Sequence, residues 1–374
     1  MKKYKGLIIL ISLFVPSVVI YAGLLLICSL SEYNILLSIL VQIIGLIVVI
    51  PLFIAIHEAG HMVFGIKTGY KLLSYKLGPL EWYRKDEKIK FRVNPLNGIV
   101  LGQCLMSPPK PNKKVKPKFY LYNAGGLIFS YTFDIILCVL FFVINNVYIK
   151  LLLIPMISIS VFLTINNSLY QKGGINDVCN HVIVKNNPKY INSILYQLEM
   201  ITNITNGKRY GAKTYYEPYF EDELNHITLP VAQLRFLQAV DKSDFVEAKR
   251  ISTIIKRNYN RIPLVLQKVS VIFEILYTDL VIDSDMLAFK VHFRWIKEKE
   301  KAVCLKPDYE IYHYYNIYNK IYKGEFDIKE DVMNLLSNEA IVAGEKLSIE
   351  KKFNFLIDKI NFYASNGNSF DVEE

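Results

Sequence analysis

Two histidines and a glutamate occur in the sequence with a spacing that suits metal chemistry. The segment Ile56–His61 reads Ile-His-Glu-Ala-Gly-His, which is the pattern H-E-x-x-H. On a helix, residues i and i+4 lie on one face, so His57 and His61 can direct ring nitrogens at one ion. Zinc lowers the pKa of a bound water to about 7, and Glu58 can take the proton of that water. The pattern predicts His57 and His61 as zinc ligands and Glu58 as the catalytic base.

A zinc site of this kind also needs a third protein ligand and an open fourth position. Two acids, Asp177 and Asp134, are the candidates in the apolar part of the chain. Asp177 follows the last apolar run, on the side of the membrane where the helix of His61 ends. Asp134 lies in the middle of another run, about 22 Å from its start at 1.5 Å per residue. Depth therefore favours Asp177, and Asp134 remains the alternative.

The chain segments that must hold these candidate site residues in place are strongly apolar. Hydrophobic residues make up 52% of the 374 residues, and the mean hydropathy is +0.25, which excludes a disordered chain. A run near 20 residues can cross about 30 Å of hydrocarbon. We expect four membrane spans at Gly6–Leu30, Ile35–Ile66, Phe119–Ile144 and Leu151–Ile165. The first is interpreted as a retained helix rather than a signal peptide, and the short fourth, with Pro155, as an interrupted helix.

The charges predict the orientation of these spans. The net charge is +10, and the loop Lys67–Lys118 contains 13 Lys/Arg but only three acids. By the positive-inside rule, the N-terminus, this loop and the chain after about residue 170 are cytoplasmic. We therefore expect a multi-pass protein of the cell membrane that contacts the lipid bilayer and has no nucleic-acid partner. Five widely spaced cysteines without C-x-x-C predict buried thiols rather than a disulfide scaffold.

Two further patterns lie outside the spans. Short β-rich segments, interrupted by turn residues, predict a small β-hairpin or sheet at the membrane surface; they are Ser74–Leu77, Lys88–Val93 and Ile99–Met106. Beyond the spans, apolar residues recur at helical spacing and predict an all-α domain of helical hairpins. The expected domains are the first two spans (1–66), a basic loop with a β-hairpin (67–118), two further spans with the aspartate segment (119–185), and a cytoplasmic α-helical domain (186–374).

Three stretches resemble the site-2 protease family of intramembrane zinc metalloproteases. They are Ile56–Gly65 with the H-E-x-x-H, Asn123–Gly126 with its small residues, and Asn166–Leu169 followed by Gly173–Asp177. Residues 98–109 resemble a bacterial branch, and the whole resemblance covers residues 35–185, without the C-terminal half. It implies a zinc endopeptidase in which His57, His61 and Asp177 bind Zn²⁺ and Glu58 is the general base. It also implies that Asn166 or Asn167 contacts the substrate backbone or polarises its carbonyl.

The sequence departs from the family pattern at three places. Leu169 or Tyr170 stands where the family has Pro, Val178 follows the ligand aspartate in place of Gly, and Ser130 and Tyr131 stand where an Asn often follows the glycine pair. These departures concern the residues that would stabilise the oxyanion. They do not touch the H-E-x-x-H.

The resemblance also leads to a prediction of the substrate. It implies membrane-embedded peptides or single-span proteins, which must unwind before water can attack them. An exposed β-edge can pair with such a strand, and Ile99–Met106 is the candidate edge, with Gly102 as a substrate-binding residue. A structural hairpin under the helix bundle is the alternative for this segment. The alternative is a catalytically weak or inactive membrane adaptor whose helical C-terminal domain binds a protein partner.

Overall fold

The fold was obtained as a computed structural model, and it forms two compact units, residues 1–187 and 188–374. It describes residues 18–26, 34–85, 88–93, 101–110, 118–170, 176–219, 224–262, 265–296, 298–305, 310–338 and 341–365. Most of these residues are helical, and one small antiparallel sheet lies in the first unit.

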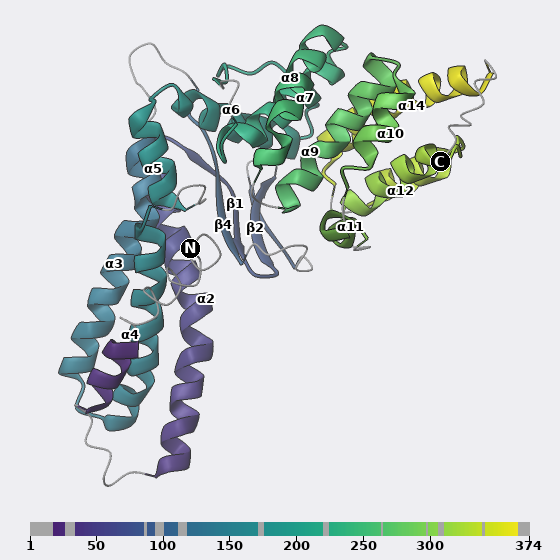
Figure 1. Cartoon of the computed structure of the whole chain (residues 1–374). Helices are drawn as coiled ribbons and strands as arrows, with labels where there is room; N and C mark the ends of the chain where they lie inside the picture. The colour runs from purple at the N-terminus through teal and green to yellow at the C-terminus, as the bar shows by residue number, and fades with distance from the viewer. Residues whose placement is uncertain are drawn as a thin grey trace. The chain divides into compact units, whose positions relative to one another are not determined.

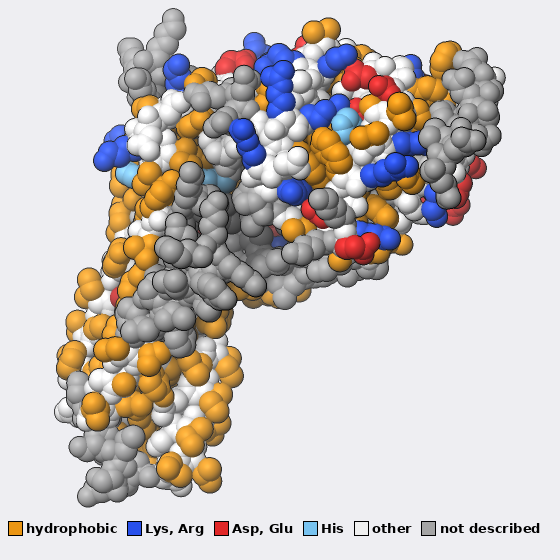
Figure 2. Space-filling model, in the orientation of Figure 1, with side chains coloured by type: hydrophobic (Ala, Val, Ile, Leu, Met, Phe, Trp, Pro, Cys, Tyr) orange, Lys and Arg blue, Asp and Glu red, His pale blue; other side chains and the backbone are white. Residues whose placement is uncertain are grey.

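Three long helices form the apolar part of the first unit. They are α2 (Ile35–Lys67), α3 (Phe119–Val143) and α4 (Val147–Ser168), and they pack side by side (Figure 1). Each is long and apolar enough to cross a membrane. Their outer surface is covered mainly by hydrophobic side chains (Figure 2), as expected for helices that face lipid. Most of the expected first span, Gly6–Leu30, lies outside the described residues, and residues 18–26 within it are helical.

The sequence explains where these helices begin and why they continue. Asn34 and Asn146 precede α2 and α4, and each side chain accepts a hydrogen bond from a backbone N–H of the first turn. The expectation of an interrupted fourth span is wrong, because α4 runs unbroken through Pro155 for 22 residues. Gly45 of α2 makes room for this proline: a Cβ there would lie 2.9 Å from the Pro155 ring. Close packing on a neighbouring helix thus accommodates the proline.

The sheet lies between α2 and α3 in the sequence. Its strands are β1 (Lys71–Leu77), β2 (Leu80–Lys85), β3 (Lys88–Val93) and β4 (Gly102–Ser107), in the order β3-β2-β1-β4 with every neighbouring pair antiparallel. Strands were predicted at three of these places, and of the predicted β-hairpin or sheet the structure shows the sheet, which β2, a strand that was not predicted, completes. Within the described residues β4 is an edge strand, and it contacts α2.

The second unit is an array of helices, as predicted. A buried stripe of Ala248, Ile251 and Ile255 on α8 forms part of its core. Consecutive helices such as α7 and α8, or α12 and α13, pack against each other. The helices are α6 (Tyr190–Thr205), α7 (Thr228–Asp241), α8 (Phe245–Asn258), α9 (Val265–Tyr277), α10 (Met286–Phe293), α11 (Glu298–Cys304), α12 (Glu310–Tyr322), α13 (Lys329–Ser337) and α14 (Ala343–Ser365).

Candidate metal centre

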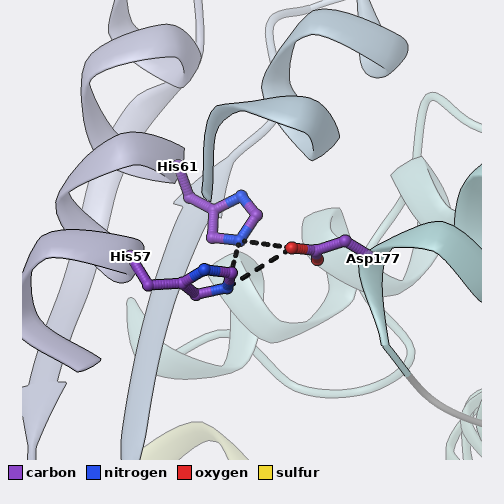
Figure 3. Close-up of side chains that lie close together, drawn as sticks. All are labelled: His57, His61 and Asp177. Carbon is purple, nitrogen blue, oxygen red and sulfur yellow. Dashed lines mark hydrogen bonds and ion pairs between the residues drawn. The ribbon is translucent and has the colours of Figure 1, made fainter. Parts of the chain in front are cut away.

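Three side chains converge where α2 meets α5 (Asp177–Asn186). His57 and His61 lie one turn apart on α2, and their Nε2 atoms are 3.3 Å apart. Asp177 is the first residue of α5, and its Oδ2 lies 3.3 Å from each of the two Nε2 atoms (Figure 3). The long helix thus supplies two of the three converging atoms, and a segment more than 100 residues later supplies the third.

The other nitrogen of each imidazole is held by α3. His61 Nδ1 lies 3.1 Å from the backbone carbonyl of Tyr122, which can only accept, so this nitrogen carries the proton. His57 Nδ1 lies 3.0 Å from Ser130 Oγ, whose own proton goes to the carbonyl of Gly126. The same tautomer follows for His57. Both Nε2 lone pairs therefore remain available and face Asp177.

This geometry fits a metal ion. In a tetrahedral zinc site, ligand atoms about 2.0–2.1 Å from the ion are about 3.3–3.4 Å from one another. The three pairwise distances between His57, His61 and Asp177 are all 3.3 Å. Asp177 Oδ2 is buried and receives no hydrogen bond, which is costly for a carboxylate oxygen unless a cation lies beside it. Among the described residues, these three form the group that could hold a metal.

The turn before α5 places Asp177. The Oδ1 atom of Asn176 accepts a hydrogen bond from the backbone N–H of Cys179 and so begins the helix. Its Nδ2 donates to the carbonyls of Asn166 and Leu169, 3.0 Å away in each case. One asparagine thus joins the end of α4 to the start of α5, next to the third ligand atom.

A second asparagine fixes the backbone of the ligand itself. Asn123 Nδ2, on α3, donates to the carbonyl of Asp177 at 2.8 Å. The Asp177 side chain faces the two Nε2 atoms, 3.3 Å from each. Metal ligands must be deprotonated, so Asp177 would bind an ion as a carboxylate.

Glycines on both helices create the space for this arrangement. A Cβ at Gly60 would lie 2.2 Å from the carbonyl oxygen of Gly125, so the backbones of α2 and α3 touch there. A Cβ at Gly126 would lie 2.5 Å from His61 Nε2 and 2.8 Å from His57 Nε2. Gly125 thus allows the two helices to approach closely, and Gly126 leaves room for the two rings.

Glu58 lies against the edge strand of the sheet. The backbone N–H of Cys104 in β4 donates a hydrogen bond to its carboxylate. A Cβ at Gly102 would lie 2.1 Å from Ile54 Cγ2 and 3.4 Å from Glu58 Oε1. The absence of a side chain at Gly102 therefore lets β4 approach the H-E-x-x-H turn.

The other predicted residues lie elsewhere. Asp134 is buried in α3, where Ser160 of α4 donates a hydrogen bond to it, and it is not part of the three-residue group. Asn166 and Asn167 lie in the last turn of α4, and the carbonyl of Asn166 takes part in the Asn176 bridge. Ser130, Asn123 and Asn176 were not predicted as supporting residues.

Removal of the Ser130 hydroxyl is expected to weaken metal binding. In Ser130→Ala, the Nδ1–H of His57 loses its acceptor in a buried place, and the ring loses its fixed orientation. Residues that orient a ligating histidine typically contribute about 10–100-fold in metal affinity. Competition with a zinc chelator in detergent measures the dissociation constant. Ser158→Ala is the matched control, because this buried serine of α4 bonds only to the Ile154 carbonyl of its own helix. Equal affinities in the two variants would contradict the expected role of Ser130.

The sequence was also compared with known proteins. Residues 45–302 match the model of a family described as peptidase family M50. No curated protein and no solved structure matches the chain significantly. The match runs from α2 through α5 and continues to α11, so the expectation that the C-terminal half lies outside the likeness is wrong.

Proposed function

Because the chain belongs to peptidase family M50, the site-2 protease family, we propose that it is an intramembrane zinc metalloprotease. It would hydrolyse peptide bonds of membrane-embedded or membrane-proximal peptides, including single-span proteins. The observation that supports this most directly is the meeting of His57 Nε2, His61 Nε2 and Asp177 Oδ2 at 3.3 Å within an apolar helical bundle. An intramembrane cluster of ionisable groups of this kind is costly unless it has a functional role.

The chain's own residues have separate tasks in this mechanism. His57, His61 and Asp177 would hold Zn²⁺, which supplies Lewis acidity and makes a water molecule acidic near neutral pH. Glu58 accepts that proton on its carboxylate and passes it to the leaving amine. The backbone N–H of Cys104 helps to hold this carboxylate in place.

The edge strand provides a place for the substrate. An unwound segment could pair with β4, because main-chain hydrogen bonds to the edge would replace those lost from the substrate helix. Gly102 brings this edge next to Glu58, so a strand paired there would present its peptide bonds close to the base. The amides of Asn166 and Asn167 at the end of α4 would donate to the substrate carbonyl.

The orientation in the membrane completes the proposal. With Gly6–Leu30 as a further span, four helices would place the N-terminus, the basic loop 67–118 and the unit 188–374 in the cytoplasm of the cell. Lysines of the loop would lie at anionic lipid headgroups. The helical unit would be free to bind a protein partner on that side.

The metal content of the natively purified protein tests this proposal. We expect about one zinc per chain in mild detergent, as a site with three protein ligands requires. Asp177→Ala should lose this zinc, because two imidazoles alone bind it weakly. Asp134→Ala should keep it, since its carboxyl bonds to Ser160 instead. No zinc in the wild-type protein, with helical content intact, would refute the metalloprotease and favour a non-catalytic adaptor.

A further inference from the structure

The helical unit contains a cavity that the peptidase chemistry does not use. Its volume is about 290 Å³, and it lies between α7, α9, α12 and α14. Acidic and aromatic side chains share its wall; those used below are Tyr210, Phe273, Glu274, Glu310, Tyr314 and Glu345. Three carboxyl groups thus face one enclosed space in a part of the chain without a catalytic motif.

One of the three carboxyl groups already has a partner. Lys352 Nζ lies 2.7 Å from Glu274 Oε2, and both residues are almost fully buried, with exposed fractions of 2% and 3%. The same ammonium lies over the rings of Phe236, Tyr277 and Tyr314, at 5.8, 5.2 and 5.3 Å from their centroids. The Lys352 charge is therefore used within the protein, and Glu274 is neutralised.

The other two carboxyl groups have uncharged hydrogen-bond partners: tyrosine hydroxyls and, for Glu345, also the backbone at Val342. Tyr210 donates to Glu345 Oε1 at 2.7 Å, and Tyr314 hydrogen-bonds to Glu310. Neither acid forms an ion pair with any Lys, Arg or His in the described part of the chain. Burial raises the pKa of both carboxyls, and the proximity of Glu345 raises that of Glu310 further, while the nearby Lys352 ammonium offsets only part of this rise. The cavity therefore has an excess of acceptor groups over cations.

The spacing of these acids indicates the kind of cation. A metal ion needs ligand atoms within a few ångströms of one another, and among the described residues such a group of three occurs only at His57, His61 and Asp177. The three acids of the cavity do not form such a group, and Phe273, Tyr314 and Tyr210 line the same cavity. Aromatic faces and carboxylates together suit a flat or bulky organic cation.

We propose that this cavity binds an ammonium or guanidinium group, which Glu310 and Glu345 hold beside the aromatic walls. The group could belong to a free amine or to a basic side chain of a peptide, and both sources share this chemistry. The site would be separate in its residues from the metal centre, and it would give the helical unit a ligand of its own.

Binding to the full-length protein in mild detergent tests the proposal. The probes are N-acetylarginine amide, which represents a peptide side chain, and agmatine, which represents a free amine. N-acetylcitrulline amide, with a neutral urea in place of the guanidinium, is the matched control ligand. Titration calorimetry should show at least about tenfold tighter binding of the better cationic probe than of the citrulline compound, because charge-assisted bonds are lost with the charge.

Variants connect the binding to the two acids. The double variant Glu310→Gln/Glu345→Gln should lose the preference for the cation, whereas Glu350→Gln, on an exposed position of α14, should keep it. Circular dichroism confirms that each variant is folded. Tighter binding of agmatine would identify a free amine as the source, and tighter binding of N-acetylarginine amide would identify a peptide. Absence of binding, equal binding of the citrulline compound, or an unchanged preference in the double variant would overturn the proposal. None of these readouts depends on zinc or on cleavage.

Discussion

Replacement of Glu58 with Gln is expected to lower the rate of peptide cleavage by about 10²–10⁴-fold, the usual contribution of a general base. An amide cannot accept the proton that the carboxylate would take. The size of the side chain hardly changes, and its oxygen can still accept the Cys104 N–H. His57, His61 and Asp177 are untouched, so the zinc content should remain that of the wild-type protein.

Cleavage of a model transmembrane peptide in detergent, together with zinc per chain, measures both expectations. Glu81→Gln is a suitable control, because this acid lies on β2 and pairs with Arg92 rather than facing the histidines. The base assignment is falsified if Glu58→Gln cleaves as fast as Glu81→Gln. A loss of zinc in Glu58→Gln would show instead that the glutamate supports the metal.

Addition of a single methyl group at Gly126 is expected to disrupt the metal centre. The Cβ of Gly126→Ala would lie 2.5 Å from His61 Nε2 and 2.6 Å from His57 Cε1, far inside van der Waals contact. The rings must rotate or α3 must move away, and either change separates the ligand atoms. Since loss of orientation alone typically costs about 10–100-fold in metal affinity, we expect at least that decrease and a parallel loss of cleavage.

A matched glycine separates this effect from general helix destabilisation. Gly23 lies in the helical residues 18–26, and a Cβ there meets no atom within 4 Å. Gly23→Ala should therefore bind zinc as the wild-type protein does, and chelator competition compares the two variants. Wild-type affinity in Gly126→Ala would show that the rings do not occupy the positions described.

The residues that were predicted correctly depend mostly on local geometry. His57 and His61 share a face because one helical turn separates them, and this holds in any helix. The expected depth of each residue in the membrane was enough to favour Asp177 over Asp134 as the third ligand, and the structure places Asp177 beside the histidines. The helical spacing of apolar residues was also sufficient to predict helices where α7 and α8 lie, and their buried faces are typical of amphipathic helices.

The parts that were missed depend on contacts between distant segments. Ser130 supports His57 only because Gly60 and Gly125 allow α2 and α3 to touch. The spacing of residues within one segment cannot reveal such a contact between two helices. Strand β2 reads Leu-Glu-Trp-Tyr-Arg-Lys, with charges on a short segment that becomes a strand through pairing with β1 and β3. The continuity of α4 likewise depends on Gly45 of another helix.

The third ligand begins a short helix that leads to the rest of the chain. Asp177 opens the ten-residue α5, and the second unit starts at Pro188. An ion that binds only the complete triad stabilises the docked α5 by RT ln(1 + [M]/Kd), which is about 2.7 kcal/mol at 100 times Kd. Linkage is reciprocal, so a force that draws α5 away from α2 weakens ion binding by the same free energy. A zinc ion bound at this centre would therefore also hold α5 against α2, with a strength that depends on the free zinc concentration.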